Sequence, residues 1–273
     1  MARPILKLQN VNKRFPLPQG FFDRVRRRPI EHIHAVRDIS LQIAEGEIFG
    51  LVGESGSGKT TLVRMIAGLL EPDEGILQFR GKNLQGMARA ERRRIQMVFQ
   101  NQYGSLNPRL TIGFTLAEPL RVFGIVPAEE VQSEVTRLLE QVSLPAHIAN
   151  RYPAELSGGQ RQRVAIARAL SVRPEVLIAD EAISGLDASI RAQVLNLLVD
   201  LRKEHGFAMI FITHDIGATD YLCDRIGVMH EGRLVEVGPI RDVLDAPLHP
   251  YTRSLLAAVP SLRDLSALPE AAE

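Results

Sequence analysis

Hydrophobic residues follow two different rhythms along this chain. In the first 80 residues, short apolar or alternating runs are separated by turns, as in ILKLQNVNKRF, AVRDISLQIAEGEIFGLVG and GILQFRGKNL. From about Ala117 to Ala169 the apolar positions recur at helical spacing, and one such face carries Val131, Val135, Leu138, Leu139 and Val142. The pattern predicts a β-rich N-terminal part followed by a helical part.

Two compact apolar runs come later in the chain. They read VLIAD and AMIFITHD, and the amphipathic stretch SIRAQVLNLLVDLRKEHG lies between them. A strand, a helix of this length and a second strand are typical of a right-handed parallel crossover. The predicted fold class is therefore α/β.

Composition narrows the class of protein. The chain has 273 residues and a net charge of +1, which gives no field strong enough to indicate a nucleic-acid partner. The single cysteine, Cys223, excludes a disulfide framework or a multi-cysteine metal site within one chain and fits a reducing compartment. The start, MARPILKLQNVNKRF, lacks the apolar core of a secretory signal, and no run has the ~18 apolar residues of a spanning helix. We therefore expect any membrane role to come through a partner.

The segment IFGLVGESGSGKTTLVRMIAGLL predicts a nucleotide site. An apolar strand leads into a glycine-rich loop, and an apolar-faced helix follows, so a chance glycine-rich turn is disfavoured. Such a loop curls its amides around phosphate oxygens, Lys59 can reach the outer phosphates, and the Thr60 hydroxyl can bind Mg²⁺. The predicted nucleotide-binding residues are Gly53, Glu54, Ser55, Gly56, Ser57, Gly58, Lys59, Thr60 and Thr61.

Two adjacent acids end the run VLIADE. Asp180 falls at the carboxyl end of a buried strand, where parallel sheets bind ligands, and suits a Mg²⁺ ion bridging nucleotide phosphates. Glu181 can polarise an attacking water as a general base. The alternative is a pair that caps a helix, and the phosphate loop decides against it.

Gln100 and His214 end two further strand-like runs, RIQMVFQ and MIFITH. The Gln100 amide can contact Mg²⁺ or the attacking water, and the His214 imidazole can donate to a γ-phosphate. Each residue alone is more often a surface or structural side chain. The catalytic interpretation rests on the prediction that these strand ends share one sheet edge with the phosphate loop.

The stretch LSGGQRQRVAIARAL places two adjacent glycines directly before a helical run. Glycine lowers backbone stability, so bare amides at a helix start indicate an anion site. Which anion it binds is not fixed by the stretch itself.

Taken in order, GESGSGKT, Gln100, LSGGQ, VLIADE, SGLD and ITHD resemble the ATP-binding subunit of an ATP-binding-cassette (ABC) protein. The resemblance implies a mainly parallel core with an N-terminal antiparallel β subdomain and an inserted helical subdomain at about 102–170. It implies an ATPase domain over 1–240, a C-terminal extension over 241–273, and ATP with Mg²⁺ as the ligands.

The resemblance also implies a head-to-tail pair of cassettes. Ser157, Gly158, Gly159 and Gln160 would then contact the γ-phosphate of the partner's ATP, and Asp187 would lie at the seam and couple the two sites. Phe15 matches the aromatic residue that stacks on adenine, with Phe21 and Phe22 as alternatives. Whether the partner is a copy of this chain or, as the resemblance favours, a sister subunit stays open.

The tail DAPLHPYTRSLLAAVP, with IQMVFQ and SLNPRLTIG, resembles the peptide and nickel importer branch. That branch implies two permease subunits, a solute-binding protein and a peripheral location on the cytoplasmic face of the inner membrane. Tyr103, Leu106 and Pro108 would face a permease helix. The rivals are a soluble cassette acting on DNA or ribosomes, disfavoured by length and near-neutral charge, and an exporter or lyase-associated cassette, disfavoured by the tail.

Some positions depart from the branch pattern, namely Asn101, Gln102, Ala179 and Gly185, but none is a predicted phosphate, metal or water ligand. The run RVRRRP within residues 20–33 carries four arginines. We interpret it as a solvated surface loop in preference to a lipid contact.

Overall fold

The computed structural model describes residues 3–17, 32–99 and 106–258, and their strands form two sheets. The first sheet is antiparallel, with the order β2-β1-β4-β5. Its strands are β1 (Pro4–Pro16), β2 (His32–Ala44), β4 (Glu74–Phe79) and β5 (Lys82–Asn83).

The second sheet has the order β10-β9-β3-β8-β7-β6 and is parallel except for β10, which pairs antiparallel with β9. Its strands are β3 (Ile48–Val52), β6 (Ile95–Val98), β7 (Val176–Asp180), β8 (Ala208–Ile212), β9 (Arg225–His230) and β10 (Arg233–Pro239). Every residue of β3, β7 and β8 is buried, as expected for parallel strands covered on both faces.

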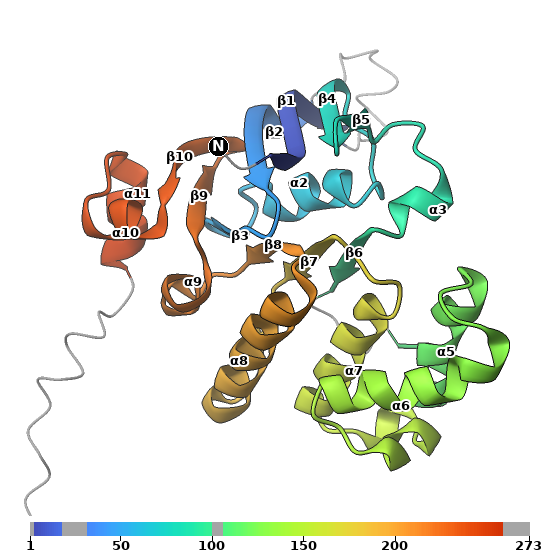
Figure 1. The fold of residues 1–273 in the computed structure, drawn as a ribbon. Coiled ribbons are helices and arrows are strands. Elements are labelled where there is room, and N and C mark those ends of the chain that lie inside the picture. The colour runs from blue at the N-terminus through green and yellow to red at the C-terminus, as the bar shows by residue number, and fades with distance from the viewer. Residues whose placement is uncertain (1–2, 18–31, 100–105, 259–273) are drawn as a thin grey trace, which may run out of the picture.

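Helix α2 (Lys59–Ile66) lies between the two sheets (Figure 1). Its apolar residues Leu62 and Met65 share one buried cluster with Leu6 of β1 and Ile178 of β7. This packing fixes the start of α2, and with it the loop that joins β3 to α2.

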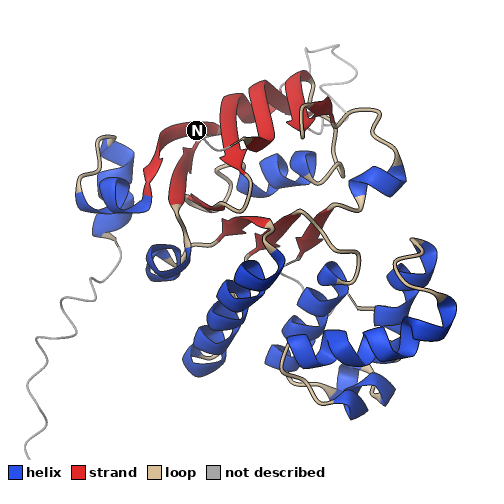
Figure 2. Ribbon diagram, in the orientation of Figure 1, coloured by secondary structure: helices blue, strands red, loops and turns tan. Residues whose placement is uncertain are grey.

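The middle of the chain forms a helical group that Figure 2 shows beside the parallel sheet. The apolar face predicted between Val131 and Val142 is buried in a cluster with residues of α5 and α7, which confirms that prediction. The helices and 3-10 turns of this group are α5 (Ile112–Val122), η1 (Ala128–Glu130), α6 (Val131–Gln141), η2 (Ala146–Asn150), η3 (Pro153–Glu155) and α7 (Gly158–Leu170).

The remaining helices flank the parallel sheet. They are α3 (Arg89–Arg92), α8 (Ala188–His205), α9 (Ile216–Leu222), α10 (Ile240–Asp245) and α11 (Pro250–Ala257). Helix α8 joins β7 to the adjacent parallel strand β8, as the sequence predicts. Within the described part of the chain, no helix combines the length and the apolarity needed to cross a membrane.

The strand order confirms the predicted fold class and positions the candidate site. Strands β3, β8 and β7 are neighbours and run in the same direction, so their carboxyl ends lie at one edge of the sheet. Gly53 follows β3, Thr213 follows β8 and Glu181 follows β7 at that edge. Parallel sheets bind ligands at such an edge.

Candidate nucleotide site

The phosphate loop (Gly53–Thr60) passes too close to neighbouring backbone for side chains at two of its glycines. Gly58 caps the start of α2 with φ 103°, and a Cβ there would lie 2.1 Å from the Ala35 carbonyl oxygen. Gly53 has φ 147°, and a Cβ there would lie 2.1 Å from the Met229 carbonyl oxygen. The loop is thus held between β2 and β9, and glycine gives its backbone the conformations that a phosphate-binding turn requires.

The Lys59 side chain folds back onto the backbone of the phosphate loop to which it belongs. Its Nζ donates to the carbonyl oxygens of Gly53 and Glu54, each at 2.7 Å, and the side chain is buried. Burial lowers the pKa of the Lys59 amine, while the charges of Glu181 and Asp180 oppose that shift. A buried ammonium whose partners here are neutral carbonyls is well placed to bind an incoming polyphosphate.

Asp180 ends β7 and Glu181 follows it, at the sheet edge where the phosphate loop follows β3. Asp180 is buried, and desolvation, then the neighbouring Glu181 charge, raises the pKa of its carboxyl. Glu181 has φ 49°, a left-handed conformation that is unusual for a side chain other than glycine. Its amide donates to the Ile212 carbonyl at 3.0 Å, and Ser184 Oγ donates to Glu181 Oε2 at 3.2 Å. Backbone strain held in place at a site edge is typical of functional residues.

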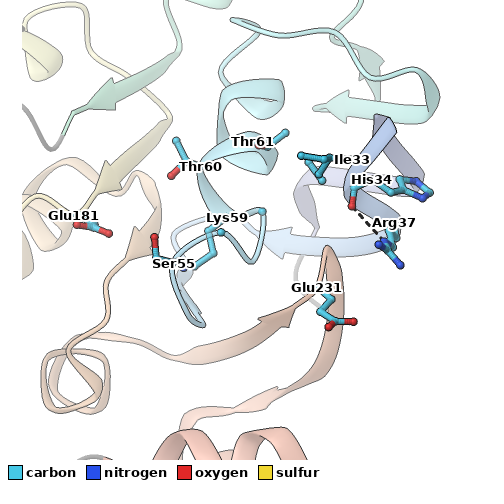
Figure 3. Close-up of a pocket in the computed structure, with 12 residues that line it drawn as sticks. Ile33, His34, Arg37, Ser55, Lys59, Thr60, Thr61, Glu181 and Glu231 are labelled. Carbon is cyan, nitrogen blue, oxygen red and sulfur yellow. Dashed lines mark hydrogen bonds between the residues drawn. The ribbon is translucent and has the colours of Figure 1, made fainter. Parts of the chain in front are cut away.

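A cavity of about 430 Å³ opens over these groups (Figure 3). Seven of its lining residues were predicted, namely Ser55, Gly56, Gly58, Lys59, Thr60, Thr61 and Glu181. Five others were missed by the sequence reasoning: Ile33, His34, Ala35, Arg37 and Glu231. They come from β2 and from the turn after β9.

The turn after β9 explains how distant residues reach this cavity. The Gly232 amide donates to the Ser57 carbonyl at 3.0 Å, and the Arg37 amide donates to the Gly232 carbonyl at 2.7 Å. The turn therefore ties the phosphate loop to β2. No local motif marks these residues, because their position depends on pairing between distant segments.

Phe15, the aromatic residue predicted to stack on adenine, lies on β1, next to the strand β2 that lines the cavity. Phe15 on β1 pairs in register with Ile33 on β2, and Ile33 lines the cavity whereas Phe15 does not. Directly paired residues share one face of a sheet, so the half-exposed Phe15 ring lies beside the cavity wall. Phe21 and Phe22 lie outside the described residues, as do Gln100, Asn101, Gln102, Tyr103 and the arginine run.

His214 and Asp187 lie near the same sheet edge but do not line the cavity. His214 is exposed directly after Thr213, and the next residue, Asp215, caps α9. Asp187 is exposed at the start of α8 and makes no side-chain cap hydrogen bond. Arg191 links the two segments, since its guanidinium pairs with Asp215 at 2.8 Å and donates to the Leu186 carbonyl at 3.4 Å.

The signature segment (Ser157–Gln160) is not brought to the cavity at all. Ser157 caps α7: its Oγ accepts from the Gln160 amide at 3.2 Å, and Gln160 Oε1 accepts from the Ser157 amide at 3.0 Å. A Cβ on Gly159 would lie 2.6 Å from Ile190 Cγ2, whereas one on Gly158 would meet only Leu186 Cδ2 at 3.9 Å. Gly159 therefore permits close packing against α8, whereas packing among the described residues does not require a glycine at Gly158.

The residues at and beside the cavity could bind a hard divalent cation such as Mg²⁺ only together with the phosphate oxygens of a bound nucleotide. Thr60 lines the cavity, whereas Asp180 does not line it but ends β7 directly before the lining residue Glu181. Both side chains offer the oxygen donors that Mg²⁺ prefers. Across the part of the chain that the structure describes, no three His, Cys, Asp or Glu side chains gather as a metal site. Phosphate oxygens would have to complete the coordination.

Comparison with known proteins agrees with this arrangement. Residues 36–184 match the family model described as ABC transporter. The chain belongs to the ABC transporter family. Residues 235–272 also match the family model described as oligopeptide/dipeptide transporter, C-terminal region.

Curated relatives are longer than this chain. It is 49% identical over 263 residues to the glutathione import ATP-binding protein GsiA of an Escherichia coli strain, and the match covers 95% of this chain and 42% of the relative. The protein of the same name from Pectobacterium atrosepticum is 46% identical, also with 42% of its length covered. The chain therefore spans less than half of these relatives.

Solved structures agree over nearly the whole chain. The ATP-binding cassette MJ0796, in a dimeric post-hydrolysis state bound to ADP and Pi, superposes with a TM-score of 0.73 and 32% identity, covering 86% of this chain and 99% of that one. CbiO1 from Clostridium perfringens, part of the ABC transporter complex cbiONQ, gives a TM-score of 0.76 and 29% identity, covering 97% and 99%. Both likenesses extend the family assignment to the three-dimensional arrangement.

Proposed function

We propose that this chain is the ATP-hydrolysing subunit that powers an ABC importer for peptides or related small solutes. The observation that carries the proposal is the cavity that joins the phosphate loop to Glu181 at one sheet edge. The GsiA relatives are named for glutathione import, which favours a small peptide-like solute over nickel and over a non-transport complex.

In this proposal the phosphate loop binds the polyphosphate of ATP and Lys59 neutralises its outer charge. Glu181 orients and polarises the attacking water, and His214 donates to the γ-phosphate. Thr60 and Asp180, with Gln100, would hold Mg²⁺, which supplies neutralisation of phosphate charge when bound. Phe15, next to Ile33, would stack on the adenine ring from the side of β1.

A second cassette would complete the site. The signature segment sits at a helix start, carries an exposed Ser157, and lies outside this chain's own cavity. These features fit a role toward a nucleotide held by a partner in a head-to-tail pair. The exposed Asp187 would lie at the same seam. The partner is proposed to be a non-identical subunit.

The permease contact is proposed at a second groove, of about 540 Å³, between the parallel sheet and α5. Its walls include the apolar side chains of Phe99, Val122 and Phe123 with the charged Arg93 and Glu118. A short amphipathic helix of a membrane subunit matches that mixture. Leu106, expected at this contact, is instead buried in the helical core, because it packs with the apolar residues of α5 to α7; Pro108 is exposed.

The same proposal sets domains and location. Residues 1–240 would form the ATPase domain, with the helical subdomain at about 102–170, and 241–273 the extension typical of this importer branch. Two permease subunits would hold the chain peripherally on the cytoplasmic face of the inner membrane, and a solute-binding protein would deliver the solute.

The test is co-purification of the Glu181→Gln variant with its genomic neighbours in ATP and Mg²⁺. Loss of the general base should lower kcat about 1,000-fold while ATP binding is kept, which traps the closed pair. Two permeases and a second cassette in the eluate would support the importer. Recovery of the chain alone, or with ribosomes or soluble enzymes, would refute it. Wild-type protein in ADP is the matched control.

A further inference from the structure

Tyr251 touches the phosphate loop although it lies 197 residues further along the chain. The Glu54 amide donates to the Tyr251 hydroxyl oxygen at 3.1 Å. Glu54 is the second residue of the phosphate loop, and Tyr251 is the second residue of α11. None of the nucleotide motifs includes Tyr251.

The Tyr251 ring is held in place from several sides. It stacks on His230, the last residue of β9, with ring centroids 3.7 Å apart and 24° between planes. The Tyr251 backbone amide donates to His249 Nδ1 at 3.1 Å. The Glu236 carboxylate on β10 accepts from the amides of Leu248 and His249 at 2.8 and 3.0 Å. The start of α11 is thus tied to β9 and β10, so the hydroxyl has a defined position.

The same segment shares a hydrophobic cluster with the strand that leads into the loop. Val52, the last residue of β3, packs with Ile226 and Val228 of β9 and with Ile240 and Val243 of α10, and Tyr251 packs against this cluster. Figure 1 shows α10 and α11 together beside β9 and β10. A displacement of α11 would therefore disturb the packing of Val52, the residue directly before Gly53.

Glu54 is held through both of its backbone polar groups. Its carbonyl oxygen accepts from Lys59 Nζ at 2.7 Å and from the Ser57 amide at 3.2 Å, and its N–H donates to the Tyr251 hydroxyl oxygen at 3.1 Å. Without the Tyr251 hydroxyl, this amide loses its acceptor, and one of the hydrogen bonds that fix the Glu54 backbone is missing. The orientation of Glu54 consequently depends on both side chains.

We propose that Tyr251 is a positioning residue of the nucleotide site, through which the C-terminal segment sets the affinity of the phosphate loop for ATP. The inference rests on the proposed ATP-binding function and deepens it. Tyr251 acts through Glu54 and contacts no reacting atom. The extension thus has a defined task toward the nucleotide, in addition to its place in the fold.

The decisive variant is Tyr251→Phe, which removes the hydroxyl and keeps the ring that stacks on His230. We expect the KM for ATP of the assembled transporter to rise about fivefold with kcat unchanged, as loss of one net hydrogen bond implies. In the nucleotide-free full chain, hydrogen exchange at the Glu54 amide should accelerate about fivefold as well. Tyr251→Ala, which also loses the stack, should exceed both effects.

The matched control is Tyr221→Phe. The Tyr221 hydroxyl donates to Asn196 Oδ1 at 2.5 Å, between α9 and α8, so this variant loses a tyrosine hydrogen bond that does not involve the phosphate loop. Its KM and its Glu54 exchange should equal those of the wild type. A rise in KM for Tyr221→Phe as large as that for Tyr251→Phe would overturn the inference.

A lower Tm for Tyr251→Phe with wild-type KM and wild-type Glu54 exchange would also overturn it, because a purely structural tyrosine behaves in that way. Failure of the proposed function is a separate result: co-purification without permeases would refute the importer, and a wild-type chain that does not bind ATP would refute the nucleotide site. The exchange measurement uses no nucleotide, so it reports on the Tyr251 contact in either case.

Discussion

The phosphate loop and the signature segment are both glycine-rich helix starts, yet the chain treats them in opposite ways. The phosphate loop is enclosed by β2, β9 and its own Lys59, and it lines a cavity. The signature segment is capped by Ser157 and Gln160 and lines no part of that cavity. A helix start with its own capping box is already stable alone. The difference shows that the phosphate loop is shaped by contacts within this chain and lines its cavity, whereas the signature segment is stabilised by its own cap away from that cavity.

The largest expected effect comes from Gly58→Ala on the enclosed side. A methyl group would overlap the Ala35 carbonyl and strain a backbone with φ 103°, so the loop must move. We expect the ATP affinity of the isolated chain to fall about 100-fold, measured by equilibrium binding. Gly56→Ala is the control, because Gly56 has φ 81° but no atom of the described residues lies within 4 Å of the added methyl, and its loss of affinity should be smaller. Equal losses would show that the contact with β2 is irrelevant.

Gly158→Ala tests the signature segment. Among the described residues the added methyl meets only Leu186, and alanine improves helix propensity, so the Tm should stay the same or rise slightly. If the partner's nucleotide contacts this residue, the ATPase rate of the assembled complex should fall about tenfold. ATP affinity of the isolated chain should not change. An unchanged rate in the complex would remove Gly158 from the shared site.

Gly159→Ala separates packing from ligand contact within the same segment. Its methyl would overlap Ile190, and overpacking of this kind should lower the Tm by about 5 °C in thermal unfolding. Ile190→Ala, combined with Gly159→Ala, should recover part of that loss by opening space. A double variant no more stable than Gly159→Ala alone would rule out this contact as the cause.

The smallest expected effect concerns Asp180, the buried carboxylate at the end of β7. Burial raises the pKa of Asp180, so its contribution favours folding at low pH and is lost as the pH rises through the raised folded value. At neutral pH, Asp180→Asn should therefore raise the Tm of the nucleotide-free chain by about 2 °C, and the gain should shrink on acidification. Asp187→Asn, at an exposed position, should show no gain. A lower Tm for Asp180→Asn would contradict this assignment of cause.

Much of this molecule could be predicted from local sequence. The run VLIAD is apolar over its length up to Asp180, so its burial and the exit of Asp180 at the sheet edge follow from pattern alone. The loop before Lys59 is equally local, because its glycines and the flanking strand and helix are contiguous. The fold class and the side of the cavity formed by the phosphate loop therefore follow from short contiguous stretches of sequence.

What escaped prediction depends on contacts between distant segments. Ile33 lines the cavity in place of Phe15 because β1 and β2 pair in one particular register, which alternation alone does not fix. Glu231 reaches the cavity through a turn whose backbone bonds to Ser57. Tyr251 lies in a segment recognisable as an extension, but nothing in its local sequence indicates a hydrogen bond with the amide of Glu54. Leu106 was expected outside and is buried for the same reason.

The close approach of Gly159 to Ile190 has a mechanical consequence. Gly158 lies next to Leu186, and Asp187 follows it directly, so the signature segment and the Asp187 turn are parts of one packed unit. No side chain at residue 159 stands between them to act as a compressible spacer. A displacement of α7 is therefore transmitted to the Asp187 turn with little loss, so the two segments form one rigid surface of this chain.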